Sequence, residues 1–374
     1  MRARAAILHG MGAPAPYAQS RPLTIETVEL DPPGPGEALV KIAAAGLCHS
    51  DLSVINGDRP RPLPMALGHE AAGVVAAVGA GVDDLTPGDH VVMVFMPSCG
   101  HCVPCAEGRP ALCEPGAAAN GKGELLAGGR RIRLEGQPVH HHLGCSAFAD
   151  YAVVSRRSLV KIDPELPLAE AALFGCAVLT GVGAVVNTAG VKPGQTVAVV
   201  GLGGVGLAAV LGAVASGAAQ VVAVDLQEDK LALARDLGAT AVVNGAASDA
   251  VDQVRSLTGG GVDVAVELAG AVPALDAAVR MTRRGGLTVT AGLPPPGAAL
   301  PVNVVGLVAE ERALKGSYIG TCVPVRDIPR YIALYRAGRL PVDRLMSGRL
   351  PFEDINLGFD RLRQGAVVRQ VIEF

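Results

Sequence analysis

Two kinds of hydrophobic pattern divide this chain near residue 178. Before that point, short runs of β-branched and other apolar residues alternate with turns rich in Gly and Pro. The runs lie at 23–30, 37–46, 71–79 and 89–95. Several short strands separated by turn residues are typical of an antiparallel sheet that curls toward a barrel. We therefore predict an antiparallel, partly barrel-like domain for the first part of the chain.

After residue 178, short apolar strands alternate with Ala-rich helical stretches. The strands lie at 196–200, 220–225, 241–244, 262–268 and 286–292. Strands that are apolar on both faces and separated by helices indicate βαβ units and a parallel sheet covered on both sides. The tail, residues 351–374, is predicted to form a helix and a final strand that returns to the first domain.

Two stretches without any charged residue, 171–191 and 196–224, are long enough to raise the question of a membrane helix. Gly interrupts both, and the second divides better into a strand, a turn and a helix. We expect buried segments of a soluble protein. The first residues contain only a very short apolar run, so we expect no cleaved signal peptide and a location in the reducing cytoplasm.

Composition narrows the classes of partner. The chain has 374 residues, of which 50% are apolar and 18% charged, and its formal net charge is −3. That length is enough for two domains with a substantial core. Without blocks of Lys or Arg, the chain has no electrostatic footprint for nucleic acid or for an anionic membrane. A small-molecule partner is therefore expected.

Four of the eight cysteines lie within residues 99–113, in the spacing C-x2-C-x2-C-x7-C. A disulfide framework is rare in the cytoplasm, and a chain of this length has no need of one. Iron–sulfur runs of the bacterial ferredoxin type place the fourth Cys three residues after the third and follow it with Pro, a spacing not found here. The spacing favours a closed structural zinc site. Its expected ligands are Cys99, Cys102, Cys105 and Cys113.

A glycine motif opens the second region. Gly201, Gly203 and Gly206 form G-x-G-x-x-G directly after a predicted strand and at the start of a helix. Such glycines let the backbone approach a pyrophosphate, and the start of the helix favours negative charge. Asp225 ends the next strand, where a carboxylate accepts hydrogen bonds from the adenosine ribose and repels the extra phosphate of NADP. We predict NAD as the cofactor; the alternative is a purely structural Asp at the end of a strand.

Further candidate metal ligands lie in separate motifs: Cys48 in GLCHSD, His69 in GHE and Cys176 in LFGCAVLTG. Each has an ordinary explanation, because a lone Cys is usually buried packing and a lone His is usually a hydrogen-bonded core residue. In a chain that also carries a dinucleotide motif, two thiolates and an imidazole suggest a catalytic zinc with an open fourth position.

The order of these motifs resembles the zinc-dependent alcohol dehydrogenases of the medium-chain dehydrogenase/reductase superfamily, in particular their liver-type branch. GLCHSD, GHEAAGVVAAVG, the four-cysteine lobe, FADYAVV, GCAVLTG, GLGGVGLAAV, KGSYIG and GFDRLRQG follow one another over nearly the whole chain. The resemblance implies an α/β protein with a GroES-like, mainly antiparallel catalytic domain and a central Rossmann domain with a doubly wound parallel sheet. The expected domains are residues 1–177 with 320–374, and residues 178–319.

The resemblance also implies roles for single residues. Cys48, His69 and Cys176 correspond to the catalytic zinc ligands, so two zinc ions per chain are expected together with the lobe. Asp51 corresponds to a carboxylate that orients His69, Glu70 to a nearby acid, and Ser50 to the hydroxyl that contacts substrate and starts a proton relay. The positions implied to contact the cofactor are His49 and Arg369 at the pyrophosphate, and Thr180, Val205 and Lys230 in the remaining pocket. Those implied to line the substrate pocket are Arg59, Phe95, Leu112, His142 and Leu143.

Several positions depart from the family pattern. Ser53 stands where many liver-type enzymes have a relay His, and Ala117 stands where the glutathione-dependent formaldehyde dehydrogenases have an Arg. Arg59 would pair with a carboxylate-bearing alcohol, unless it extends to solvent as long charged side chains commonly do. The run His140–His142 is expected in a loop.

These expectations combine into one function. The resemblance implies reversible hydride transfer between NAD and a primary alcohol, aromatic or of medium chain length, by a homodimer or homotetramer. Phe95 and the leucines of the expected pocket suit an apolar chain or ring, and Cys176 favours the alcohol branch over the polyol dehydrogenases. The alternatives are a glutathione-dependent formaldehyde dehydrogenase and a non-catalytic nucleotide- or zinc-binding protein.

Overall fold

The computed structural model describes residues 1–374 and divides them into two compact units. Unit 1 comprises Met1–Cys176, Val323–Ile332 and Met346–Phe374, and unit 2 comprises Ala177–Cys322 and Ala333–Leu345. The sequence placed all of 320–374 with the first domain, but Ala333–Leu345 belongs to unit 2. There the guanidinium of Arg339 donates to the carbonyl of Ala215, and that of Arg344 donates to the carbonyl of Asp236.

A closed barrel forms one half of unit 1. Its strand order is β1-β2-β7-β8-β4. The bounds are β1 (Arg2–Leu8), β2 (Leu23–Leu30), β4 (Met65–Ala66), β7 (Ile132–Leu134) and β8 (Gln137–His141). Alternate apolar residues, among them Ile7, Val28 and Ile132, fill the interior. The partly barrel-like antiparallel domain predicted from the sequence is confirmed.

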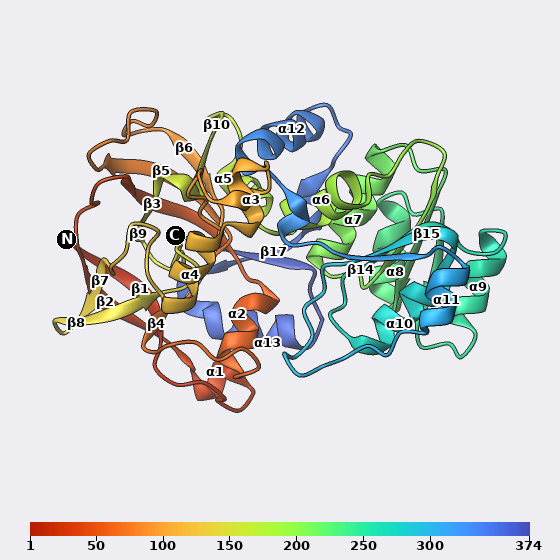
Figure 1. Cartoon of the computed structure of the whole chain (residues 1–374). Coiled ribbons are helices and arrows are strands. Elements are labelled where there is room, and N and C mark those ends of the chain that lie inside the picture. The colour runs from red at the N-terminus through yellow and green to blue at the C-terminus, as the bar shows by residue number, and fades with distance from the viewer. The chain divides into compact units, whose positions relative to one another are not determined.

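A second sheet in unit 1 runs in the order β10-β6-β5-β3-β18-β17, and β9 also pairs with β3. The bounds are β3 (Glu37–Gly46), β5 (Ala71–Val78), β6 (His90–Met93), β9 (Tyr151–Ser155), β10 (Leu159–Ile162), β17 (Met346–Pro351) and β18 (Arg369–Glu373). The last strand of the chain, β18, lies between β17 and β3. Figure 1 marks the C-terminus, which follows β18, near the strands of unit 1. The predicted return of the tail to the first domain is therefore correct.

Short helices connect these strands. The α-helices of unit 1 are α1 (Tyr17–Ser20), α2 (His49–Ile55), α3 (Val103–Ala106), α4 (Glu114–Lys122), α5 (Leu168–Ala172) and α13 (Ile355–Arg363), while α12 (Pro324–Arg336) begins in unit 1 and its last residues belong to unit 2. Its 3-10 helices are η1 (Pro110–Leu112), η2 (Arg156–Ser158), η3 (Leu173–Gly175) and η7 (Phe352–Asp354). Of these, α2 and η3 carry or precede the candidate catalytic residues.

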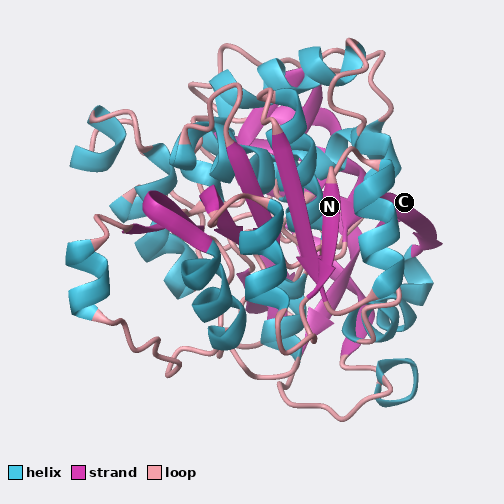
Figure 2. Ribbon diagram, turned by 90° about the vertical axis from the view of Figure 1, so that its right-hand side faces the viewer, coloured by secondary structure: helices cyan, strands magenta, loops and turns pink.

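Unit 2 is built on a six-stranded parallel sheet in the order β13-β12-β11-β14-β15-β16. Its strands are β11 (Thr196–Val200), β12 (Gln220–Asp225), β13 (Ala241–Asn244), β14 (Val262–Glu267), β15 (Thr282–Thr290) and β16 (Ala313–Gly316). Its helices are α6 (Ala177–Gly183), the π-helix η4 (Ala184–Ala189), α7 (Gly204–Ala215), α8 (Glu228–Asp236), α9 (Ala250–Leu257), α10 (Val272–Met281), α11 (Val304–Ala309), and the 3-10 helices η5 (Ile319–Thr321) and η6 (Val342–Leu345). Helices lie on both sides of the strands (Figure 2), which confirms the predicted Rossmann-like domain.

No single helix is both long and apolar enough to cross a membrane. The bent pair Leu168–Gly175 and Ala177–Ala189 meets that test only when both helices are taken together, and only by length and composition. Most residues of both helices are buried in the structure.

Candidate active site and metal centres

Cys48, His69 and Cys176 come together inside unit 1 from three separate segments. Their ligand atoms all lie within 4.8 Å of one another. Cys48 precedes α2, His69 follows β4, and Cys176 follows η3. All three side chains are buried, and the thiol of Cys176 lies 3.6 Å from Nε2 of His69. The structure thus assembles two thiols and one imidazole, as the sequence predicted.

Glycines precede two of these residues and allow the close packing. Gly68, before His69, has a φ of +97°, and a Cβ there would lie 2.4 Å from the backbone nitrogen of Phe148. A Cβ on Gly175, before Cys176, would lie 2.2 Å from the carbonyl oxygen of Met93. A larger residue at either position would therefore clash with a neighbouring backbone segment beside the cluster.

The two thiols of the cluster shift the pKa of each other in opposite directions. A hydrogen bond from Cys176 holds the pKa of Cys48 well below that of a free thiol, while the pKa of Cys176 is raised well above it. The chain thus favours one thiolate at this place even though both thiols are buried. Sulfur and imidazole nitrogen are preferred zinc ligands, and three protein ligands leave a position open, so the donor set fits a catalytic zinc.

Asp51 lies behind His69, on the side away from the thiols. Its two carboxylate oxygens are each 3.1 Å from Nδ1 of His69. The same carboxylate accepts from the backbone N–H of Gly68 and lies 3.1 Å from Nδ1 of His142. Burial disfavours the charged carboxylate, but the nearby imidazoles outweigh it, and the pKa of Asp51 is lowered. Asp51 is therefore placed to fix the orientation of the His69 ring, as the sequence predicted.

Glu70 and Arg369 form a buried pair beside the cluster. Nη1 of Arg369 lies 3.3 Å from a carboxylate oxygen of Glu70 and donates to the carbonyl of Leu47. Burial raises the pKa of Glu70 to about 7, against the opposing effect of the Arg369 charge. Arg369, which the sequence analysis expected at the pyrophosphate, is thus paired with Glu70, which it expected near the metal. No local sequence motif indicated this contact.

The other predicted residues of α2 are only partly buried. Ser50 is half-buried in the first turn of the helix, and His49 is exposed at its start. Ser53, at the position of the missing relay His, donates its hydroxyl to the carbonyl of His49. The hydroxyl of Ser53 is thus used within the helix.

The residues expected to line the substrate pocket differ in how close they lie to the cluster. The ring of Phe95 packs edge-on against His69, with centroids 5.3 Å apart. Leu143 is buried, Arg59 is half-buried, and Leu112 is 38% exposed in the cysteine lobe.

The structure corrects one expectation about the histidine run and shows a new contact of His142. His140 and His141 lie in strand β8 and not in a loop, because they pair in parallel with Met65 and Ala66 of β4. His142, expected in the substrate pocket, is 1% exposed and contacts Asp51. Nothing in the sequence linked these positions, which lie far apart in the chain.

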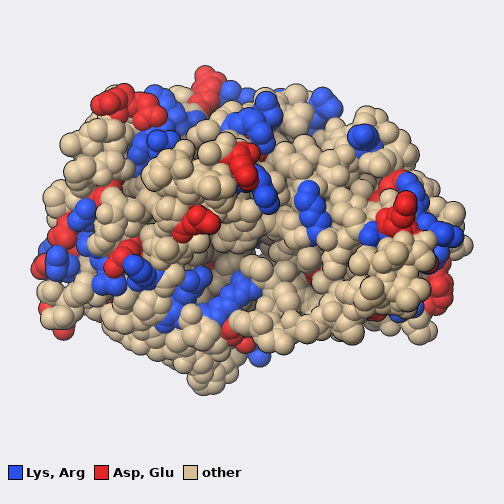
Figure 3. Space-filling model, viewed as in Figure 1, with Lys and Arg blue, Asp and Glu red and all other residues tan.

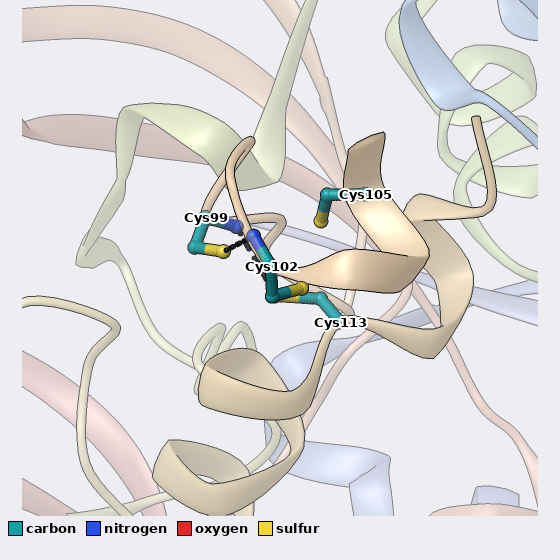
Figure 4. Close-up of side chains that lie close together, drawn as sticks. All are labelled: Cys99, Cys102, Cys105 and Cys113. Atoms are coloured by element: carbon teal, nitrogen blue, oxygen red, sulfur yellow. Dashed lines mark hydrogen bonds between the residues drawn. The ribbon is translucent and has the colours of Figure 1, made fainter. Parts of the chain in front are cut away.

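The four cysteines of the lobe point toward a common space (Figure 4). Their sulfur atoms all lie within 4.8 Å of one another, and none forms a disulfide. Zn–S bonds of about 2.3 Å in a tetrahedron would place the sulfurs about 3.8 Å apart. The lobe therefore fits a zinc ion after small movements of the side chains.

Backbone N–H groups also point at the sulfurs of the lobe. Cys113 accepts from the backbone nitrogens of Cys99 and Gly116, and Cys99 accepts from those of His101 and Cys102. The N–H of His101 is the main reason why the pKa of Cys99 falls to about 6, whereas burial raises the pKa of Cys105 to about 12. Donors aimed at sulfur favour thiolates, the form that binds metal.

In unit 2, the glycine motif lies between β11 and α7. Gly201 has a φ of +91°, and a Cβ on Gly206 would lie 1.8 Å from its carbonyl oxygen, so both positions require Gly. A Cβ on Gly203 would meet no protein atom within 4 Å. The backbone at Gly203 is therefore open on this side, as the approach of a phosphate group to the start of a helix requires.

The other predicted cofactor residues lie in the same unit. Asp225, at the end of β12, accepts from the backbone nitrogens of Leu202 and Gln227, at 2.6 and 3.0 Å. It thereby ties the end of its strand to the glycine turn and is half-buried. The remaining positions, Thr180, Val205 and Lys230, are also half-buried.

Comparisons with known proteins agree with this arrangement. Residues 34–164 match the family model described as alcohol dehydrogenase GroES-like domain, and residues 204–337 match that described as zinc-binding dehydrogenase. An alcohol dehydrogenase zinc-binding domain protein from Burkholderia ambifaria is 36% identical, with a TM-score of 0.94, over 100% of this chain and 99% of its own. Benzyl alcohol dehydrogenase from Acinetobacter calcoaceticus is 32% identical, with a TM-score of 0.93 and the same coverage. A zinc-binding dehydrogenase from Sinorhizobium meliloti, solved with NADP, is 27% identical, with a TM-score of 0.80 and full coverage of both chains.

Proposed function

This chain belongs to the zinc-dependent alcohol dehydrogenases of the medium-chain dehydrogenase/reductase superfamily, and from that premise we propose an NAD-dependent enzyme for primary alcohols. It oxidises aromatic or medium-chain alcohols to aldehydes, and the reaction is reversible. The observation that carries the proposal is the buried cluster of two thiols and an imidazole. The similarity to a benzyl alcohol dehydrogenase supports an aromatic substrate.

The chain's own residues divide the work of this reaction. Cys48, His69 and Cys176 hold the catalytic zinc, and Asp51 keeps the His69 ring in position. When bound, zinc supplies a Lewis acid that makes the alcohol proton more acidic, and NAD supplies the hydride acceptor. The hydroxyl of Ser50 takes part in moving the alcohol proton away. Phe95, packed on His69, offers an apolar wall to the substrate.

The decisive experiment combines metal analysis with a substrate panel. We expect two zinc ions per chain and NADH formation with benzyl and linear primary alcohols. Formaldehyde should be no better a substrate with glutathione than without it, since Ala117 replaces the Arg of the glutathione-dependent branch. ω-Carboxylated alcohols would be preferred only if Arg59 contacts substrate. Absence of turnover from a chain that holds both zinc ions would refute the proposed activity.

Cofactor choice can be tested at Asp225. We expect Asp225→Asn to lower kcat/KM for NAD by about 10- to 100-fold, because hydrogen bonds to a charged group contribute about 1.5–3 kcal/mol. The same change should raise kcat/KM for NADP, since the negative charge that repels its extra phosphate is removed. Asp229→Asn, on exposed α8, serves as control. Equal loss with both cofactors would show that Asp225 only supports the glycine turn through Leu202 and Gln227.

A homo-oligomer is part of the proposal. Strand β16 ends the sheet of unit 2, and all its residues are exposed. Close to it in sequence, Val304, Val305 and Val308 of α11 are exposed by 67%, 77% and 71%. An open sheet edge with apolar residues favours pairing with a second copy. In light scattering, Val305→Glu should shift the oligomer toward the monomer, and Val325→Glu, at an exposed position of α12, should not. An unchanged mass of the Val305→Glu protein would exclude this surface.

The partners and the compartment of the protein are also part of the proposal. Small alcohols and aldehydes are the expected ligands, and neither nucleic acid nor membrane is expected. On the face shown in Figure 3, basic and acidic side chains are both spread among uncharged ones. None of the eight cysteines forms a disulfide, and we propose a reducing cytoplasm as the compartment.

A further inference from the structure

The carboxylate of Asp51 has more partners than its role behind His69 requires. It is completely buried, accepts from the N–H of Gly68, and lies 3.1 Å from Nδ1 of His69. Nδ1 of His142 lies at the same distance, 3.1 Å, from Oδ1. Two imidazoles thus share one buried carboxylate.

His142 is itself held firmly in place. Its backbone N–H lies 3.0 Å from the hydroxyl of Ser146 and 3.2 Å from the carbonyl of Ala66. Its ring meets that of His69 edge to face, with centroids 5.5 Å apart. Because β4 pairs with β8, the segment that leads to His69 also fixes the segment that leads to His142.

Hydrogen-bond accounting defines the proton positions. When Nε2 of His69 faces the thiols, its proton is on Nδ1 and is donated to Asp51. An ionised carboxylate only accepts. Nδ1 of His142 lies 3.1 Å from Oδ1 of Asp51 but is not aligned for a hydrogen bond in this structure, so it needs both a proton and a small turn of its ring to donate to Asp51. Such a donor would be the third partner of the buried Asp51 charge, after the N–H of Gly68 and Nδ1 of His69, and a further donor lowers the free energy of a buried charge.

We propose that His142 is a positioning residue of the catalytic metal site: its Nδ1–H fixes the Asp51 carboxylate, and Asp51 in turn fixes the His69 ring. The inference rests on the proposed function, because it assigns His69 to the catalytic zinc. Partners of this kind behind a metal ligand contribute about 10- to 100-fold to metal affinity. We expect this gain in metal affinity to come from the hydrogen-bond donor at Nδ1 of His142 and not from the volume of its ring.

Two substitutions of His142 distinguish the effect of its hydrogen-bond donor from the effect of its side-chain volume. His142→Leu removes the donor and keeps an apolar side chain of similar bulk. His142→Asn keeps an N–H donor on Cγ, where Nδ1 of His is attached. His140→Leu is the matched control, because His140 belongs to the same run but its Nδ1 donates to the carbonyl of Lys122 and not to Asp51.

The readouts are zinc content per chain, the rate at which a chelator removes zinc, and the visible absorption of the cobalt-substituted protein. We expect His142→Leu to release one zinc about 10- to 100-fold faster than the wild type and to change the cobalt spectrum. His142→Asn should restore both toward wild-type values, and His140→Leu should change neither. Thermal unfolding of each variant shows whether the fold survives.

Several results would overturn the proposal. Wild-type release and spectrum in His142→Leu, or equal defects in a folded His142→Asn, would show that the donor does not position Asp51. Three zinc ions in the wild type would mean that Asp51, His69 and His142 bind a cation of their own, since they also lie within 4.8 Å of one another. A wild type with zinc only in the lobe would refute the proposed function and this inference together, whereas the other results leave the function intact.

Discussion

Cys176→Ala is expected to lower alcohol oxidation by about 1,000-fold, equivalent to about 4 kcal/mol of transition-state stabilisation. The variant should hold one zinc ion per chain in place of two, because the buried cluster keeps only one thiol and one imidazole. Steady-state assays and elemental analysis of the same preparation measure both effects.

The matched control for this prediction is Cys145→Ala. Cys145 is as deeply buried as Cys176 and lies outside both cysteine clusters. It should keep both zinc ions and nearly all activity. A Cys176→Ala protein that retains two zinc ions and normal turnover would exclude Cys176 as a catalytic ligand.

Removal of one lobe thiol is expected to act mainly on stability. Cys102→Ala should abolish zinc binding in the lobe and lower the free energy of unfolding by about 4 kcal/mol, or Tm by roughly 10 °C, because binding of a structural zinc is folding free energy. Cys102 is only half-buried, so loss of apolar packing explains little of the effect. Calorimetry and limited proteolysis between residues 99 and 113 measure the change.

Val103→Ala separates metal loss from ordinary surface change in the lobe. Val103 neighbours Cys102 and is 68% exposed, so its truncation should leave zinc content and Tm unaltered. If Cys102→Ala keeps both zinc ions and its Tm, the lobe is not a metal site. The same conclusion follows if the purified wild type contains disulfides there.

Local pattern was sufficient to predict much of the fold. The apolar runs at 196–200, 220–225 and 241–244 coincide with β11, β12 and β13, because strands covered on both faces must be apolar throughout. The cysteine lobe could be predicted equally well, since its four cysteines are close in sequence. The candidate ligands Cys48, His69 and Cys176 could be recognised only from the order of several motifs, because no short spacing joins them.

Contacts between segments that are distant in the sequence could not be predicted from such local patterns. The short strand β4 has only two residues, and its parallel pairing with β8 brings His142 to Asp51. Likewise, Ala333–Leu345 joins unit 2 through hydrogen bonds from Arg339 and Arg344 to backbone carbonyls, which leave no mark in hydrophobic periodicity. Both outcomes depend on tertiary pairing rather than on local preference.

The position of β18 determines which unit can finish folding first while the chain is being synthesised. The strand fills the place between β3 and β17, and its first residue, Arg369, contacts Glu70. A nascent chain therefore cannot complete the sheet of unit 1 until Arg369–Glu373 has left the ribosome, and all of unit 2 has emerged before then. The surroundings of the candidate catalytic cluster are thus among the last parts of the molecule to form, and a chain that stops short of residue 369 lacks them.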